Sequence, residues 1–312
     1  MKKWIQKAIV QKAISFLPCN YKINYIFQRF ITNGVALTDE YFTCRLQHAG
    51  EHLRAYQKFS SKPTPEKCLE IGTGWYPIIP VAFFISGSAK IYSVDLRFLT
   101  TYPNVVATLK QFVLFHDKGI LSQHIKVVDD RIELLRRIAS NPQNYDLQRV
   151  LCLLNICYLV GDARNLALED DSIDLVNSNN TFEHIYPPIL IPILKECRRV
   201  VDSKNGVMSH FIDMSDHFAH FDNSISIYNF LRFSDSQWSW IDNSIQPQNR
   251  LRINDYKAIF ADLKIPISEE SIREGNVETL GTIPLNERFA MIPPEILAVS
   301  HCCFVSDMKR AN

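Results

Sequence analysis

Apolar residues cluster most clearly between residues 67 and 96, where two short apolar segments flank a longer one. KCLEIG, at 67–72, is predicted to be a short buried strand, and YPIIPVAFFISG, at 76–87, an apolar helix that begins near its prolines. KIYSVDL, at 90–96, is predicted to be a second strand that ends near Asp95. A strand, a helix and a strand within about 30 residues form a βαβ unit, which predicts a parallel sheet.

Similar strand and helix patterns continue to the end of the chain. The region from 120 to 155 is longer than a simple crossover needs and contains two extra helical patterns. We therefore predict an α/β fold, a Rossmann-like, seven-stranded, mostly parallel sheet with helices on both faces. The later strands are expected at 156–163, 172–180, 206–215, 264–271 and 295–308, and the later helices at 98–118, 187–201 and 252–263.

The chain divides into two predicted parts. Residues 1–60 are expected to form an N-terminal helical extension or lid, and residues 61–312 the main domain. The polar, proline-containing sequence SSKPTPEK joins them. Within the main domain we expect a helical insertion at about 120–155 and a substrate-side insertion at about 214–250.

Three helices are predicted in the N-terminal extension. Apolar residues mark one face of the first helix, and lysines such as Lys7 lie elsewhere, so this helix either packs on its own domain or rests on a membrane surface. A second helix is expected at 21–31 and a third at 37–59, with Thr38 as its cap. A lid, a dimer interface and a peripheral membrane contact are three open roles for these helices.

Composition adds few restrictions. The chain has 312 residues, of which 46% are hydrophobic, and its formal net charge is +1, so nothing indicates a nucleic-acid partner. The eight cysteines show no CxxC pair, and free thiols in a reducing cytoplasm are the simplest interpretation. No uninterrupted apolar stretch is long enough to cross a bilayer. We therefore expect a cytoplasmic protein.

The candidate chemistry begins with acidic residues at three predicted strand ends, Glu70, Asp95 and Asp162. Ligands of open α/β sheets bind at the carboxyl ends of the strands. The glycines of GTG, Gly72 and Gly74, allow the backbone to approach a ligand closely. Three carboxylates are better suited to a ligand with ribose hydroxyls, an ammonium and a sulfonium than to a diphosphate.

A dinucleotide-binding loop is the main alternative to this interpretation. Its fingerprint requires a third glycine at position 77, where this chain has Pro77, preceded by the bulky Trp75 and Tyr76. Glu70 beside the loop would also repel a pyrophosphate. A nicotinamide-dependent oxidoreductase is therefore the second hypothesis, and a non-catalytic interaction module with the same fold is the third.

Four motifs give the chain a family resemblance. LEIGTGWYP, VDL, GDARNL and DSIDLVNSNNTFEHI resemble, in order and spacing, the first four motifs of the class I S-adenosylmethionine-dependent methyltransferases. The similarity covers roughly residues 66–215, apart from the long gap between the second and third motifs. NSNN does not match the Asn/Asp-Pro-Pro-Tyr/Phe pattern of enzymes that methylate amino groups of nucleic acids, which argues against that substrate class.

The resemblance implies S-adenosyl-L-methionine as the cofactor. Glu70 is then expected to bind the methionine ammonium, Asp95 the two ribose hydroxyls, and Asp162 the exocyclic amine of adenine. A carboxylate is suited to a vicinal diol because it offers two acceptor oxygens. The full set of cofactor-binding residues implied in this way is Glu70, Gly72, Gly74, Asp95, Asp162, Ala163 and Asn179.

Candidate catalytic residues lie in HFIDMSDHFAHFD, at 210–222, and in FEHI. Methyl transfer to oxygen usually needs a base as well as alignment. We predict that Asp213, His217 and His184 supply it, with an aspartate orienting a histidine. A divalent metal held by carboxylates and imidazoles, and a polar loop without a catalytic role, are the alternatives; the prediction assigns no metal ligand.

The stretch from 230 to 256 combines tryptophans with arginines. Aromatic faces suit sugar rings and arginines suit carboxylates or phosphates, whereas an aromatic core under an inserted lid is the structural alternative. The leading prediction is a methyltransferase that acts on an oxygen of a small molecule or saccharide. Its expected partner is that substrate, and no nucleic-acid partner is expected. Contact with a membrane surface and pairing with a second copy of the chain both stay open.

Overall fold

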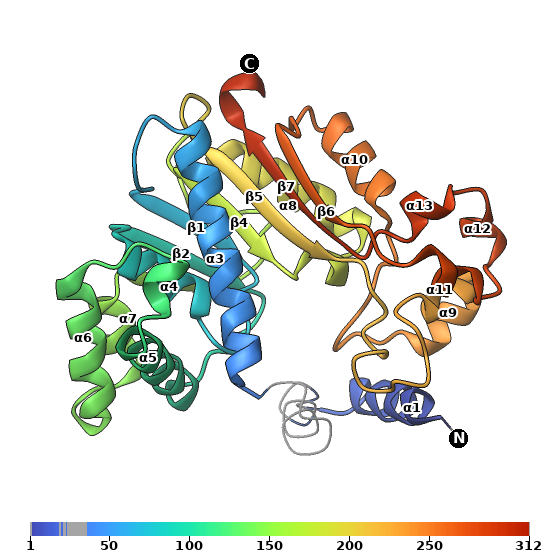
Figure 1. Cartoon of the computed structure of the whole chain (residues 1–312), viewed down its shortest axis with the longest axis horizontal. Helices are drawn as coiled ribbons and strands as arrows, with labels where there is room; N and C mark the ends of the chain where they lie inside the picture. Colours follow the sequence, from blue (N-terminus) through green and yellow to red (C-terminus); the bar gives the residue numbers. More distant parts are fainter. Residues whose placement is uncertain (1, 19, 21–22, 24–35, 312) are drawn as a thin grey trace.

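The predicted βαβ unit is present, formed by β1 (Lys67–Ile71), α4 (Ile78–Ser86) and β2 (Lys90–Asp95), and its strands pair in parallel. All nine residues of α4 are buried, which explains why its sequence is apolar on every side. The computed structural model describes residues 2–18, 20, 23 and 36–311, so the second helix predicted at 21–31 lies outside the described residues except for Ile23 (Figure 1).

Seven strands form one sheet in the order β3-β2-β1-β4-β5-β7-β6. The first five strands are parallel to one another, and β7 is antiparallel to both of its neighbours. The predicted seven-stranded, mostly parallel sheet is therefore confirmed, and the carboxyl ends of β1 to β5 lie along one edge. The remaining strands are β3 (Ile156–Val160), β4 (Leu175–Asn179), β5 (Val207–Asp213), β6 (Glu269–Arg273) and β7 (His301–Asp307).

Helices cover both faces of the sheet (Figure 1). On one face α3 (Asp39–Phe59) contacts α4, β4 and β5, and Thr38 caps it as predicted, because its side chain accepts a hydrogen bond from Tyr41 N. The same apolar cluster includes α5 (Tyr102–Asp117). On the other face α8 (Pro187–Val200) and α10 (Ile253–Asp262) cover a second apolar cluster.

Shorter elements occupy the connections. Helical segments are found within 120–155 and within 214–250, although the division of the chain into domains stays a prediction. The first group is η1 (Leu121–Gln123), α6 (Asp129–Ser140), η2 (Pro142–Asn144) and α7 (Leu147–Leu153). The others are η3 (Phe182–His184), η4 (Asn229–Arg232), α9 (Asp235–Ile241), α11 (Val277–Gly281), α12 (Glu287–Ala290), α13 (Pro294–Leu297) and η5 (Met308–Ala311).

The first helix, α1 (Lys3–Ser15), packs beside α9 on the segment that follows β5 (Figure 1). Trp4 lies 6.0 Å from the ring of Phe218, so the helix packs on its own chain, one of the two roles expected for it. Lys7, predicted to lie off the apolar face, is instead 8% exposed, and its Nζ is 5.3 Å from the centroid of Phe221. A long aliphatic stem allows such burial. Phe16 is exposed, and a membrane contact stays a prediction.

Two strand boundaries differ from the prediction. The last strand begins at His301, because Pro294–Leu297 forms α13, and proline is favoured in the first turn of a helix. The sixth strand lies at Glu269–Arg273 rather than at 264–271. Proline has no N–H for a sheet ladder, which explains why Pro266 does not belong to this strand.

Much of the stretch from 230 to 256 packs into a core, although Trp240 is exposed. Trp238 is 4% exposed, which supports the structural interpretation. Arg252 is fully buried and donates hydrogen bonds to backbone carbonyls of Met214, Leu297 and Val299. Arg250 is buried too and donates to carbonyls of Phe230 and Phe233. Of the two alternatives, the structural one therefore holds for these two arginines, which satisfy loop carbonyls.

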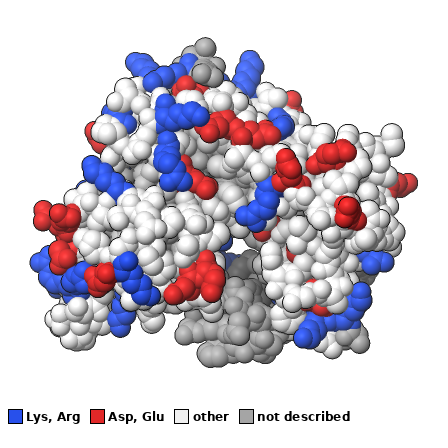
Figure 2. Space-filling view, in the orientation of Figure 1, with Lys and Arg blue, Asp and Glu red and all other residues white. Residues whose placement is uncertain are grey.

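Basic and acidic side chains are interspersed on the face seen in Figure 2, and no broad field of one sign covers that face. This agrees with the small formal charge of +1. None of the described helices is long and apolar enough to cross a membrane. The seven cysteines of the described part, which excludes Cys19, are all free thiols, as expected.

Candidate active site

The first part of the candidate site is the loop after β1. Gly72 and Gly74 have left-handed backbones there, with φ of 85° and 72°. A Cβ at Gly72 would lie only 2.3 Å from Thr181 Oγ1, whereas a Cβ at Gly74 would meet no atom within 4 Å. Gly72 therefore lets the loop approach the segment after β4, and Gly74 lies beside open space.

This difference predicts unequal costs for two matched substitutions. Gly72→Ala is expected to lower the free energy of unfolding by about 1–3 kcal/mol more than Gly74→Ala, because only the first adds a steric overlap to the shared backbone strain. Urea unfolding of both variants measures the difference. Equal losses would mean that Thr181 moves aside at little cost.

Asp95, the last residue of β2, faces the same loop. Its Oδ2 accepts hydrogen bonds from Gly74 N at 3.0 Å and from the Tyr158 hydroxyl at 2.6 Å. Burial raises the pKa of Asp95 to about 6, although these hydrogen bonds act in the opposite direction. A partly buried carboxylate in this position is suited to accept hydrogen bonds from the hydroxyls of a ribose.

Glu70, in β1, is 2% exposed, and its Oε2 has no hydrogen-bond partner among the described residues. Burial raises the pKa of Glu70 to about 8, and the nearby Asp95 carboxylate also raises it. A buried carboxylate without a partner is costly, and a cation beside it would stabilise its charged form. Glu70 and Asp95 therefore fit a ligand that carries both an ammonium group and hydroxyls.

The other three expected cofactor residues have protein partners. Asp162 is exposed, and both of its oxygens accept hydrogen bonds from Arg164. Ala163 is buried in the apolar cluster below α8. Asn179 is buried at the end of β4, with its Oδ1 2.8 Å from His48 Nδ1. Cofactor contacts by these residues stay predictions, and Asp162 would have to share its carboxylate with Arg164 to make one.

The second part of the candidate site surrounds Asp213, the last residue of β5, which is 4% exposed. His217 Nε2 lies 3.4 Å from its Oδ2, and His301 Nε2 lies 3.4 Å from its Oδ1. His220 Nε2 is 3.7 Å from Oδ2. Burial acts to raise the pKa of Asp213, but His217 and His220 outweigh it and hold the pKa well below its usual range. Asp213 is therefore a charged carboxylate that can orient an imidazole.

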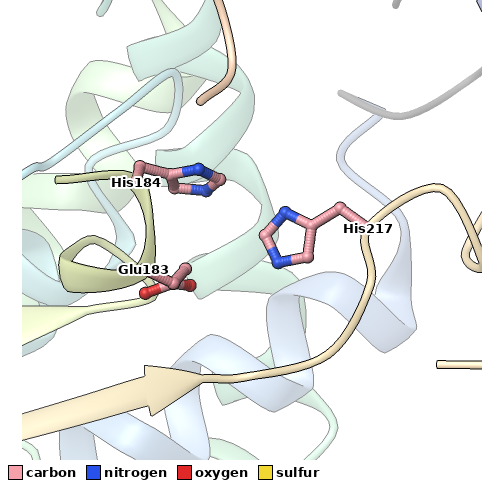
Figure 3. A group of neighbouring side chains, drawn as sticks. All are labelled: Glu183, His184 and His217. Carbon is pink, nitrogen blue, oxygen red and sulfur yellow. The ribbon is translucent and has the colours of Figure 1, made fainter. Parts of the chain in front are cut away.

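His184 and His217 face each other next to Glu183 (Figure 3), with ring centroids 4.9 Å apart. His184 Nδ1 lies 2.7 Å from the carbonyl oxygen of Pro247. Burial and the neighbouring His217 lower the pKa of His184 to about 4, which makes it a weak base. The structure thus places all three predicted catalytic residues in one cluster, and His217 is the best placed to accept a proton.

Three residues of this region were not predicted. Glu183 directly precedes His184 in the sequence, so its place beside the predicted catalytic residues could have been predicted. His301 pairs with Asp213 across the antiparallel β5–β7 ladder, a register that the sequence did not reveal. Tyr158 hydrogen-bonds to Asp95 from β3, and its hydroxyl gives no distinctive sequence signal.

Comparisons with known proteins give one family match. Residues 120–208 match the family model described as a methyltransferase domain. The matched segment covers β3, β4 and α8 and begins after the glycine loop. No curated protein sequence matches the chain.

Solved structures with a similar overall arrangement include the PH0226 protein from Pyrococcus horikoshii OT3, at 17% identity over 90% of this chain and 97% of that one, with a TM-score of 0.49. A second is 1,6-didemethyltoxoflavin-N1-methyltransferase from Burkholderia thailandensis, at 10% identity over 92% and 87%, with a TM-score of 0.47. Phosphoethanolamine N-methyltransferase 2 from Haemonchus contortus is 14% identical over 82% and 51%, with a TM-score of 0.42.

Strand order, the glycine loop and the strand-end carboxylates define an α/β enzyme that binds a nucleoside cofactor at the carboxyl edge of its sheet. Residues 120–208 match a methyltransferase domain, which agrees with the resemblance of the four motifs to the class I S-adenosylmethionine-dependent methyltransferases. This match favours a methyltransferase over the nicotinamide-dependent and non-catalytic alternatives.

The described residues fit this cofactor. Glu70 is a buried carboxylate whose Oε2 has no hydrogen-bond partner among the described residues, Asp95 is a carboxylate at the end of β2, and the position of Gly74 is open. We expect Glu70 to hold the ammonium group and Asp95 the ribose hydroxyls. When bound, S-adenosylmethionine supplies a methyl group on a sulfonium, the electrophile of the reaction.

Proposed function

We propose that the protein methylates an oxygen atom of a small molecule or a saccharide. The observation that carries this proposal is the Asp213–His217 pair at the end of β5, with 3.4 Å between Oδ2 and Nε2. An alcohol or phenol must lose its proton as it takes up a methyl group, whereas a neutral amine can attack before it is deprotonated. A carboxylate-oriented imidazole therefore favours an oxygen acceptor.

His217 would accept the hydroxyl proton. Asp213 is charged and buried, so it orients the ring and stabilises the imidazolium that forms. His184, held by the Pro247 carbonyl, packs against the same ring and limits its rotation. Phe218 and Trp238, with α1 above them, shield this side of the molecule from water.

The test is an acceptor screen that compares matched hydroxyl and amine compounds. Phenols, sugars and their amino analogues are incubated with S-adenosylmethionine, and products are identified by mass spectrometry and by the site of methylation. We expect methyl ethers as the products. Asp95→Asn should weaken binding of S-adenosylhomocysteine by about tenfold or more in calorimetry, since it removes a charged acceptor. Methylation of amines alone would overturn the proposal while leaving the enzyme class intact.

A further inference from the structure

Glu183 is a buried carboxylate that forms no salt bridge with any described residue. The residue is 3% exposed in η3, and neither side-chain oxygen has a hydrogen-bond partner among the described residues. Both burial and the nearby Asp213 raise its pKa well above the usual value. Such a group either keeps a proton or binds a cation.

The imidazoles of His184 and His217 lie close to the Glu183 carboxylate. One ligand atom from each of Glu183, His184 and His217 lies within 4.8 Å of the others (Figure 3). Ligands of one transition-metal ion, each at about 2.0–2.2 Å from it, lie roughly 3–4 Å apart. Small side-chain movements would therefore bring all three onto a single ion.

The surroundings of both histidines are those of metal ligands. A carbonyl can only accept a hydrogen bond, so His184 Nδ1, 2.7 Å from Pro247 O, carries the proton and Nε2 keeps a lone pair. His217 has the charged Asp213 3.4 Å from its Nε2, and carboxylate–histidine pairs commonly orient metal-bound imidazoles. The supporting contacts for the two histidine ligands are thus present.

We propose that Glu183, His184 and His217 form a binding site for a divalent transition-metal ion such as Zn²⁺ or Fe²⁺. Two imidazoles and one carboxylate favour such ions over Mg²⁺, which prefers oxygen ligands, and they leave coordination positions open. Only the catalytic consequence rests on the proposed function. A bound ion would lower the pKa of an acceptor hydroxyl, and His217 would then serve as a ligand instead of a base.

A second triple competes for the same histidine. Asp213, His217 and His220 also have ligand atoms within 4.8 Å of one another. His220 is 58% exposed in its side chain and bonds to Ser215 Oγ, and Asp213 already has three imidazoles around it. The side-chain oxygens of Glu183, by contrast, have no hydrogen-bond partner among the described residues. This difference favours Glu183, His184 and His217 as the metal ligands. It also makes His220 a suitable position for a control substitution.

The test uses the full chain after treatment with a chelator. Co²⁺ is titrated with detection of its visible absorption bands, and Zn²⁺ binding is measured by calorimetry, both without methyl donor or acceptor. We expect one site with a dissociation constant in the micromolar range or below. Glu183→Gln and His184→Asn should weaken binding at least tenfold, whereas His220→Gln should leave it within about twofold.

Thermal unfolding of each metal-free variant checks that it is folded, and Zn²⁺ should raise Tm in the parent but not in Glu183→Gln. Glu183→Gln is the least disruptive change, since it replaces a partnerless carboxylate by a neutral group of the same shape. Absence of binding by the folded parent overturns the proposal, as does binding lost in His220→Gln but kept in Glu183→Gln. Because no turnover is measured, either result is independent of the methyl acceptor.

Discussion

Replacing His217 with asparagine is expected to lower kcat for methyl transfer by about 10²–10⁴-fold, the usual contribution of a general base. Asparagine remains polar beside Asp213 but cannot accept a proton. Binding of S-adenosylhomocysteine should change little, because Glu70 and Asp95 lie on β1 and β2 rather than on the loop after β5. Steady-state kinetics and calorimetry on chelator-treated protein separate the two effects.

His220→Asn is the matched control for this prediction. His220 also lies beside Asp213, at 3.7 Å, but its side chain is 58% exposed, and its loss should change kcat only a few-fold. A His217→Asn variant that keeps the parental kcat would exclude His217 as the base.

Local patterns were sufficient for the cofactor side of the site. β1, the glycine turn and β2 follow one another within about 30 residues, as in other βαβ units. Parallel strands then bring Glu70 and Asp95 to one edge without any further information. Gly72 and Gly74 were predicted as close-approach positions, and both have positive φ. This part could be predicted because sequence neighbours are also spatial neighbours.

The arrangement of the residues around Asp213 depended on contacts between distant segments of the chain. Asp213 was correctly placed at a strand end, but its pairing with His301 requires the antiparallel register of β7. The role of Arg252 stayed open at the level of the sequence, because a buried arginine that binds loop carbonyls has the same sequence signature as one that binds anions. Lys7 was assigned to the wrong face because its ammonium group lies over the aromatic rings of Phe218 and Phe221. Burial of charged groups is decided by tertiary packing, not by local periodicity.

The stability of the fold is expected to fall in acid through a histidine in the sheet. His210, in β5, is fully buried, with its ring centroid 4.6 Å from that of Phe182 and its Nδ1 2.9 Å from Ser178 Oγ. Burial lowers the pKa of His210 to about 3. The unfolded chain takes up this proton near pH 6.5 and the folded chain only near pH 3, so stability is complete above 6.5 and is lost below it.

The expected loss follows from that difference in pKa. Relative to His210→Gln, which cannot titrate, the parent should lose about 2 kcal/mol between pH 7 and pH 5, and about 4 kcal/mol by pH 3. Urea unfolding of both proteins at each pH measures the difference, in which groups that titrate in both proteins, such as Glu70 and His48, cancel.

Parallel curves for His210→Gln and the parent would mean that His210 becomes protonated inside the fold. Water or a rearranged Ser178 would then have to reach a ring that now lies between Phe182 and Phe260. Since both aromatic rings are fully buried, such access would require the sheet and α10 to separate, which the apolar packing on this face opposes.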